Sequence, residues 1–391
     1  MSNDYVTRRP FTRLAPIPSY GKVFEAPYAP ADDYDRVTAD WPLLPWPRGP
    51  LSASVVSALQ RQPGTLGATP PLTNVDAMSD DDFQLALYLC YEMNYRGLAN
   101  AEWEWDPGLL NFRTELERIF VARLRDEIGY ATARLPGEMM SALEELVADC
   151  ASSSLAMYLS ASGTIDQFRE FCVHRSAHQQ RSIESETRAR PRRADEDEAA
   201  MAMIPFDEWG SSDARRVRAD FLSAVMTALG LDSSHGSYVE ILPGVTLATA
   251  NLASMFALHP LWRAALVGQL AVSEMTSMES MERYSHALFR FGLERVGRRF
   301  SQVDIVVDAR RPPLARSQIV AGLIGAGPQL GADLLFGASA VMMLEQRFGD
   351  HLLDSWTENR SSLVPWELYP RQPSIGSARG ETTSRTTITS Y

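Results

Sequence analysis

The chain has 391 residues, which is enough for one large domain or two of moderate size. Its composition of 45% hydrophobic and 22% charged residues is ordinary for a globular protein. The formal net charge of −12 argues against a nucleic-acid-binding protein, because such domains are usually basic. No run approaches 18 apolar residues, so we expect no membrane span and no membrane partner.

The cysteines and the N-terminal residues indicate in which cellular compartment the protein is expected. The three cysteines are widely spaced, odd in number and without a CxxC pair, so they predict neither a zinc finger nor a disulfide framework. The N-terminal residues contain no apolar signal core. Together these observations predict that the protein is located in the reducing cytoplasm. Lys22 is the only lysine among 37 cationic residues, a bias typical of GC-rich bacterial genomes.

Residues 1–80 are rich in proline and aromatic residues and poor in periodicity. The stretch from Trp41 to Pro50 cannot be helical, because each proline removes a donor and restricts the residue before it. We expect residues 1–80 to form an extended arm that lies over a helical body through Trp41 and Trp46, with disorder as the alternative.

Helical periodicity begins at Ser79. The run Ser79-Asp-Asp-Asp predicts a helix N-cap, since acidic side chains suit the positive end of a helix. Residues 81–130 are expected to form accessory helices and residues 131–360 the main helical domain, while residues 361–391 lack periodicity and predict a disordered tail. Within these bounds we expect helices at about 81–93, 109–125, 137–160, 165–186, 199–229, 246–256, 260–276, 280–298, 301–309, 314–326 and 331–353. The one strand-like stretch is Tyr238–Gly244, so the predicted fold class is all-α.

Carboxylates and arginines recur at helical spacing in the second half of the chain. Asp304, Asp308 and Arg311 stand at i, i+4 and i+7, which places them on one stripe of a helix. Carboxylates on facing helices are the usual way in which a helical core holds a pair of iron ions. Taken alone, however, the same spacing also fits a solvated charged face.

Several stretches, in order from about residue 80 to 356, resemble the haem-oxygenase-like non-haem iron oxygenases and oxidases, also called the iron-containing redox enzyme family. This resemblance implies a seven-helix haem-oxygenase-like fold without haem, preceded by the accessory helices. The stretches that carry it are 87–97 (LYLCYEMNYRG), 103–107 (WEWDP), 169–176 (REFCVHRS), 207–210 (DEWG), 243–248 (PGVTLA), 268–277 (GQLAVSEMTS) and 331–337 (GADLLFG).

The resemblance also implies where metal ligands should stand. Three of the seven expected ligand positions keep a family carboxylate: Glu208, Glu274 and Asp308. The other four depart from the pattern, with Ser182 in place of a glutamate and Arg218, Asp304 and Arg311 in place of histidines. Arginine is always protonated and cannot ligate a metal, so the favoured interpretation is that Arg218 and Arg311 replace the metal charge by ion pairs.

A rearranged metal site is the alternative. His178 lies one turn before Ser182 on the same helical face, and Glu186 lies one turn after it. His178 could join Glu208, Glu274, Asp304 and Asp308 in a carboxylate-rich metal site, although an ordinary partly buried histidine fits the pattern better. For the other histidines we expect structural roles: a hydrogen bond for His174, a turn for His235 and helix-end or surface positions for His259 and His286.

Three functions remain open. The first is an enzyme, in natural-product biosynthesis, that acts on a small-molecule substrate in the core without the di-iron centre. Its catalytic residues would be Glu208, Arg218, Glu274, Asp308 and Arg311, with the arginines binding an anionic group and no cofactor required. The second is an inactive homologue that binds a protein partner, or forms a homodimer, through the arm. The third keeps non-haem iron in the rearranged site and performs O2-dependent oxidation.

Overall fold

The computed structural model describes residues 44–72, 75–95, 98–129, 138–149, 153–188, 222–298 and 328–365. In these ranges every regular element is a helix, so the prediction of an all-α protein is confirmed. None of the described helices combines the length and the apolar character that crossing a membrane requires.

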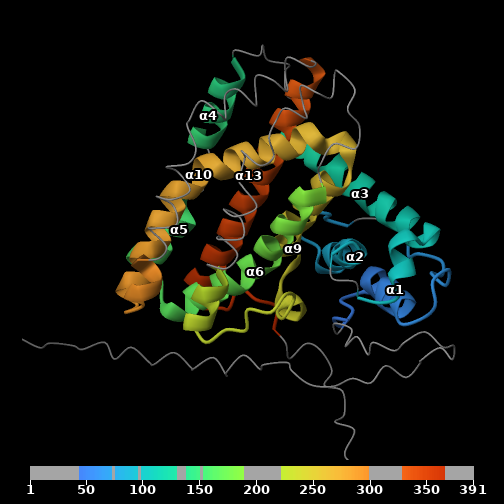
Figure 1. Ribbon diagram of the computed structural model, residues 1–391, viewed down its shortest axis with the longest axis horizontal. Helices are drawn as coiled ribbons and strands as arrows, with labels where there is room; N and C mark the ends of the chain where they lie inside the picture. Colours follow the sequence, from blue (N-terminus) through green and yellow to red (C-terminus); the bar gives the residue numbers. More distant parts are fainter. Residues whose placement is uncertain are drawn as a thin grey trace, which may run out of the picture.

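The accessory region contains α1 (Pro50–Leu59), α2 (Asp81–Glu92), the 3-10 helix η1 (Ala101–Trp105) and α3 (Pro107–Ile128). In Figure 1 these helices, blue to teal, lie together on one side of the molecule. Almost every residue of α2 is buried, because this helix packs against α1 on one side and against α9 (Gly244–Leu258) on the other. Asn251 of α9 secures this contact by donating to the backbone carbonyl of Gln84, 2.9 Å away, and to its side-chain oxygen at 2.7 Å.

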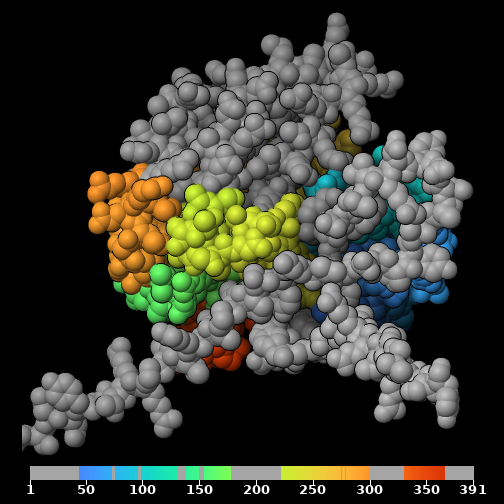
Figure 2. Space-filling view, turned by 60° about the horizontal axis from the view of Figure 1, so that its bottom comes forward, coloured from blue at the N-terminus to red at the C-terminus, as the bar shows by residue number. Residues whose placement is uncertain are grey.

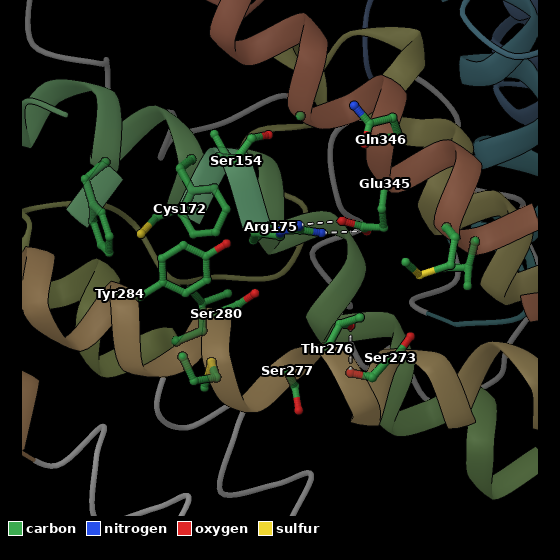
Figure 3. A pocket seen from close by; sticks show the side chains of 18 of the residues that line it. Ser154, Cys172, Arg175, Ser273, Thr276, Ser277, Ser280, Tyr284, Glu345 and Gln346 are labelled. Atoms are coloured by element: carbon green, nitrogen blue, oxygen red, sulfur yellow. Dashed lines mark hydrogen bonds and ion pairs between the residues drawn. The ribbon is translucent and has the colours of Figure 1, made fainter. Parts of the chain in front are cut away.

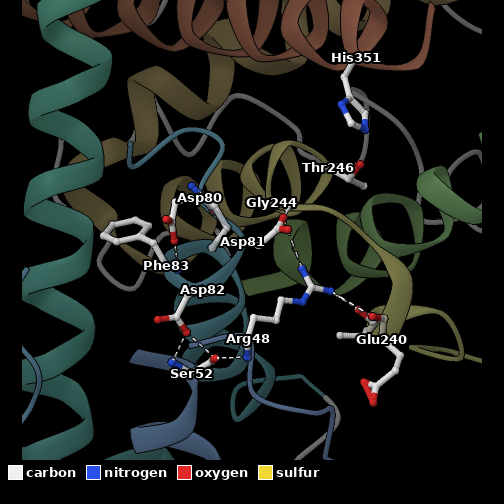
Figure 4. A network of polar contacts seen from close by, with 12 residues as sticks. Arg48, Ser52, Asp80, Asp81, Asp82, Phe83, Glu240, Gly244, Thr246 and His351 are labelled. Atoms are coloured by element: carbon white, nitrogen blue, oxygen red, sulfur yellow. Dashed lines mark hydrogen bonds and ion pairs between the residues drawn. The ribbon is translucent and has the colours of Figure 1, made fainter. Parts of the chain in front are cut away.

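Three consecutive aspartates at the start of α2 cap three different helices (Figure 4). Asp80 accepts a hydrogen bond from the backbone N–H of Phe83 and caps α2 itself. Asp81 accepts from the N–H of Gly244, the first residue of α9. Asp82 accepts from two N–H groups in the first turn of α1, at 2.7 and 2.8 Å. Because helix N-termini carry unpaired N–H groups and partial positive charge, these aspartates fix the relative positions of the three helices.

The segment before α1 is held by α2 and by the turn that precedes α9 (Figure 4). The backbone N–H of Trp46 lies 3.0 Å from both carboxylate oxygens of Glu240, and the guanidinium of Arg48 donates to the carbonyl of Val239 at 2.9 Å. Residues 44–48 therefore lie against the helical body, as expected for Trp46, whereas Trp41 falls outside the described residues.

The main helical part contains α4 (Met139–Asp149), α5 (Ser153–Ala161), α6 (Ile165–Arg188), α9, the 3-10 helices η3 (Val239–Ile241) and η4 (Pro260–Trp262), α10 (Arg263–Arg290) and α13 (Pro328–Thr357). Figure 1 shows the two longest helices, α10 in orange and α13 in red, crossing at the centre, with α6 and α9 beside α13. Figure 2 shows the segment that begins at Leu222, in yellow-green, on the surface between the orange end of α10 and the blue accessory helices.

The crossing of α10 and α13 depends on two glycines. A Cβ atom at Gly268 would lie 1.9 Å from the carbonyl oxygen of Leu334, and a Cβ atom at Gly337 would lie 2.0 Å from the carbonyl oxygen of Ala265. Both distances are far inside van der Waals contact, so each helix lies directly on the backbone of the other. Glycine at 268 and 337 is thus what brings α10 and α13 close together.

The residues after α13 turn back over α6 and α9. Ser362 is buried, and its backbone N–H and hydroxyl donate to the buried carboxylate of Glu170, at 2.9 and 2.7 Å. That hydroxyl also lies 2.9 Å from Nε2 of His174, whose Nδ1 lies 2.7 Å from the hydroxyl of Thr246. Since the Ser362 hydroxyl already donates to Glu170, Nε2 of His174 carries the proton and donates in turn.

The structure corrects several expectations about individual elements. The arm predicted for residues 1–80 contains α1, which begins at Pro50 because a proline is well suited to the first turn of a helix. The predicted strand at Tyr238–Gly244 holds the short 3-10 helix η3 instead. The tail predicted to be disordered from residue 361 includes described residues up to 365, since Ser362 is anchored as above.

Two predicted helix boundaries also differ. The single helix expected at 137–160 corresponds to α4 and α5, and the two helices expected at 260–276 and 280–298 correspond mainly to the continuous α10. The N-cap predicted at Ser79-Asp-Asp-Asp is confirmed, with Asp80 as the capping residue. The helices predicted at 301–309 and 314–326 lie outside the described residues, as does most of the one predicted at 199–229.

Candidate functional site

A cavity of about 230 Å³ lies between α5, α6, α10, α13 and the helical residues 222–228 (Figure 3). A cavity of ~150 Å³ can hold benzene, so by proportion this one takes a molecule of roughly ten non-hydrogen atoms. Its walls combine aromatic and aliphatic side chains with several hydroxyl groups. This combination of apolar walls and a few polar groups is typical of small-molecule sites.

One ion pair crosses the cavity wall. The guanidinium of Arg175 on α6 donates two hydrogen bonds to the carboxylate of Glu345 on α13, at 2.8 and 2.6 Å. The same guanidinium lies against the rings of Phe171 and Phe348, 5.4 and 4.5 Å from their centroids. Glu345 raises the pKa of Arg175 against the opposing effect of burial, so the pair stays charged. Arg175 and Glu345 are the only charged residues among those described in the wall, and their charges cancel.

Aromatic side chains from α6 and α10 close one end of the cavity. The ring of Tyr284 packs against Phe171 with centroids 4.7 Å apart and meets Phe168 edge-on at 6.2 Å. Phe168 also contacts Phe291, beyond the end of α10, at 5.6 Å. Burial raises the pKa of Tyr284 to about 12, so its hydroxyl remains protonated at neutral pH.

The wall formed by α10 is a stripe of hydroxyl-bearing residues. Its lining positions follow helical periodicity, which points them toward one side of the helix: Ser273, Thr276, Ser277, Ser280, Met281 and Tyr284. The hydroxyl of Thr276 donates a hydrogen bond to the backbone carbonyl of Val272 in the same helix, 2.9 Å away. The stripe thus lines the cavity with small polar groups opposite the apolar side chains of α5 and α6.

The ring contacts show that α6 and α10 are antiparallel. Phe168, near the start of α6, meets residues at the end of α10, and Arg175 faces Tyr284 further along. The continuation of α6 through position 178 therefore runs toward the part of α10 that contains position 274. Positions 178, 182 and 274 consequently lie toward the same end of the cavity, opposite the aromatic end.

The predicted site residues are described only in part. Two of them are placed by their helices, with the side chains outside the described set: His178 in α6 and Glu274 in α10, between the lining positions Ser273 and Thr276. Leu222 and Val225, which follow Arg218 along the chain, also line the cavity. The remaining predicted residues lie outside the described part of the chain: Glu208, Arg218, Asp304, Asp308 and Arg311.

The described residues contain no group of three or more His, Cys, Asp or Glu side chains that could hold a metal ion. This finding does not bear on the positions implied for the family's ligands, because their side chains are not among those residues. The residue types at those positions, however, do decide whether they could ligate a metal. With arginine at 218 and 311 and serine at 182, the sequence lacks the imidazole donors and one of the carboxylates, so the residues present do not fit the di-iron centre.

The expected roles of three histidines can be compared with the structure. His174 is buried in the hydrogen-bonded cluster with Thr246 and Ser362, and burial holds its pKa well below the usual value, so its predicted structural role is confirmed. His259 stands at the C-terminal cap of α9 and contacts Glu117 at 3.0 Å, and His235 lies in a turn, both as predicted. Cys172 lines the cavity, but burial raises the pKa of its thiol above the usual value, so it is not an activated nucleophile.

Sequence reasoning missed the importance of Arg175, Glu345 and Tyr284. The sequence did contain a signal for Arg175 and Glu345, since each is the one charged residue in an otherwise apolar helical stripe. Arg175 follows Phe168, Phe171 and Cys172 at helical spacing, and Glu345 ends the apolar stripe predicted for residues 331–353. The pairing itself joins positions 170 residues apart and could not be read from local pattern.

Comparison with known proteins gives one family. Residues 169–346 match the model of a family described as iron-containing redox enzyme, of the haem-oxygenase type. The match is narrower than the stretch from about 80 to 356 that carries the sequence resemblance, and it includes most of α6, all of α9 and α10, and the part of α13 up to Gln346. No curated protein matches the chain.

Proposed function

We propose, on the premise that residues 169–346 belong to the iron-containing redox enzyme family, that the chain is a divergent haem-oxygenase-like enzyme acting on a small molecule held in the cavity described above. The observation that carries this proposal is the position of the cavity. It lies mostly between matched helices, and two of the positions implied for the family's ligands, 182 in α6 and 274 in α10, lie toward one end of it. A substrate filling the cavity would reach the part of α10 that contains Glu274.

The chemistry proposed at that end uses carboxylates and arginines. Glu208, Glu274 and Asp308 are the acids retained from the family pattern, and a carboxylate in a water-poor cavity can act as a general acid or base. Arg218 and Arg311 would keep these acids ionised or bind an anionic group of the substrate by paired hydrogen bonds. No step is assigned to iron, because the donor set does not fit the di-iron centre. We also propose that the substrate is a small molecule and that the reaction belongs to natural-product biosynthesis.

The experiment that tests this function is comparative metabolite profiling. Purified protein is incubated with a small-molecule extract in air, and compounds that are consumed or formed are identified by mass spectrometry. Glu274→Gln removes the carboxylate while keeping the shape of the side chain. Glu279→Gln is the matched control, since Glu279 is an exposed residue of the same helix that pairs only with Arg283 among the described residues.

Turnover of one compound by the wild type and by Glu279→Gln, but not by Glu274→Gln, is the expected result. Equal turnover by Glu274→Gln would overturn the acid–base role. A protein that turns over nothing but co-purifies with a second enzyme would favour the non-catalytic partner, with residues 1–80 as the docking segment. Turnover that needs added iron would favour the rearranged metal site that includes His178.

A further inference from the structure

The aromatic end of the cavity contains a hydrogen-bond donor without an acceptor among the described residues. Figure 3 shows the hydroxyl of Tyr284 pointing toward the guanidinium of Arg175. A guanidinium carries only hydrogens on its nitrogen atoms, so it can face only a lone pair of the tyrosine oxygen. The positive charge also turns the O–H hydrogen of Tyr284 away from Arg175, and no described side chain accepts that hydrogen.

A second donor stands one turn earlier on α10. Ser280 lines the same wall as Tyr284, four residues before it, and residues at this spacing are neighbours on the surface of a helix. The hydroxyl of Ser280 makes no hydrogen bond to any described residue. Two hydroxyl donors therefore lie beside the aromatic surface formed by Phe168, Phe171 and the ring of Tyr284.

The electrostatics of this end favour a neutral acceptor. Arg175 is the one cation in the described wall, and both of its terminal nitrogens are bound to Glu345. A carboxylate placed against Tyr284 would be desolvated without a free cation to balance it, and it would lie close to the negative charge of Glu345. A carbonyl oxygen loses far less hydration and is satisfied by one or two hydroxyl donors.

This inference rests on the proposed role of the cavity as the substrate site. We propose that Tyr284, together with Ser280, binds the neutral carbonyl oxygen of an aromatic carboxamide, ester or ketone, whose ring packs against Phe168 and Phe171. Tyr284 follows Glu274 by ten residues, which is about 15 Å along α10. The carbonyl end of the substrate thus binds at Tyr284, at the end of the cavity away from position 274.

Benzamide and benzoate form a matched pair of probes, because they have the same shape and differ in charge. Their affinities are measured at pH 7.5 by saturation-transfer NMR titration on the full chain. Tyr284→Phe removes only the hydroxyl and keeps the ring that packs against Phe171. Tyr238→Phe is the control, since the hydroxyl of Tyr238 lies outside the cavity, where it accepts a hydrogen bond from the backbone of Asp232.

We expect Tyr284→Phe to weaken benzamide binding about fivefold, the effect of one neutral hydrogen bond, and to change benzoate binding by less than about twofold. Tyr238→Phe should leave both affinities unchanged. If Tyr284→Phe weakens benzoate as much as benzamide, or weakens neither, the assignment of a neutral carbonyl to Tyr284 is wrong while the cavity remains a ligand site. If neither probe binds the wild-type protein, the proposed substrate site itself is overturned.

Discussion

The close crossing of α10 and α13 makes a sharp prediction for the substitution Gly337→Ala. The new Cβ atom would lie 2.0 Å from the carbonyl oxygen of Ala265 and 2.4 Å from its carbon, whereas ordinary contacts begin at 3.4 Å. The helices would have to separate by roughly 1.4 Å, the difference between 3.4 and 2.0 Å. Both nearby atoms are backbone, so no side-chain rotation can relieve the contact.

Two effects of opposite sign determine the magnitude. Replacing glycine by alanine in the interior of a helix normally stabilises it by about 0.8–1 kcal/mol. Overpacking a rigid core costs about 1–3 kcal/mol, and it costs more where backbone atoms must move. At Gly337 the second effect dominates, because the separation weakens packing along the whole crossing. We expect the free energy of unfolding to fall by about 2 kcal/mol.

Gly349 provides the matched control in the same helix. A Cβ atom there would meet only the Cβ atom of Leu155, at 3.9 Å, which is an ordinary contact. Gly349→Ala should therefore stabilise the protein by about 0.5–1 kcal/mol through helix propensity alone. Urea denaturation of the two variants and the wild type, with the midpoint and the slope fitted separately, measures both effects. If Gly337→Ala is as stable as Gly349→Ala, the close crossing of α10 and α13 does not exist in solution.

Three further predictions follow, one from the capping aspartates and two from the His174 cluster. Asp82→Ala should cost about 1–2 kcal/mol, because it removes the acceptor for two N–H groups at the start of α1; a change below ~0.5 kcal/mol would argue against capping from α2. His174 stays neutral in the folded protein, so below pH ~6.5 the unfolded state binds a proton that the native state does not, and stability should fall by up to about 1.4 kcal/mol per pH unit. His174→Gln should lose this part of the pH dependence between pH 6.5 and 5.5, and an unchanged slope in urea titrations would contradict it. Ser362→Ala should cost about 1–3 kcal/mol, because it removes the hydroxyl that donates to Glu170 and accepts from Nε2 of buried His174, and near-neutral stability would contradict the anchoring of residues 361–365.

Much of the fold could be predicted from sequence where one local signal dominates. The N-cap at Asp80 and the long periodic helices α3, α6 and α13 belong to this group. The hydrogen-bond partners of Asp81 and Asp82 could not be predicted in the same way. Their partners are the N-termini of α9 and α1, and only the tertiary arrangement brings these helix ends to the start of α2.

The splitting of α10 into two predicted helices follows from the residues with which this helix borders the cavity. Its apolar periodicity is interrupted at Ser273, Thr276, Ser277 and Ser280, and these are the residues that line the cavity. A helix whose face borders a cavity does not carry a continuous apolar stripe. A prediction based on apolar periodicity therefore places a helix end where the stripe is interrupted. The same interruption is, in retrospect, a signal for the site.

The candidate site itself was predicted at positions that the described structure reaches only in part. The resemblance placed ligands at 208, 274 and 308, and of these only Glu274 lies in a described helix. The cavity beside it, with the Arg175–Glu345 pair and Tyr284, depends on contacts between α6, α10 and α13 that no local pattern specifies. Sequence thus predicted the all-α scaffold, whereas the end of the cavity with Arg175, Glu345 and Tyr284 could be found only from the structure.

The measurement that tests the central claim most directly is the metal content of the full chain, purified from cells supplemented with iron and manganese and counted per chain. If Arg218 and Arg311 have replaced the metal charge, iron and manganese should both be far below one ion per chain. A content near one or two iron ions per chain would contradict the account. It would show that Glu208, Glu274 and Asp308 still ligate metal, and the chemistry of the cavity would then have to be sought among O2-dependent oxidations.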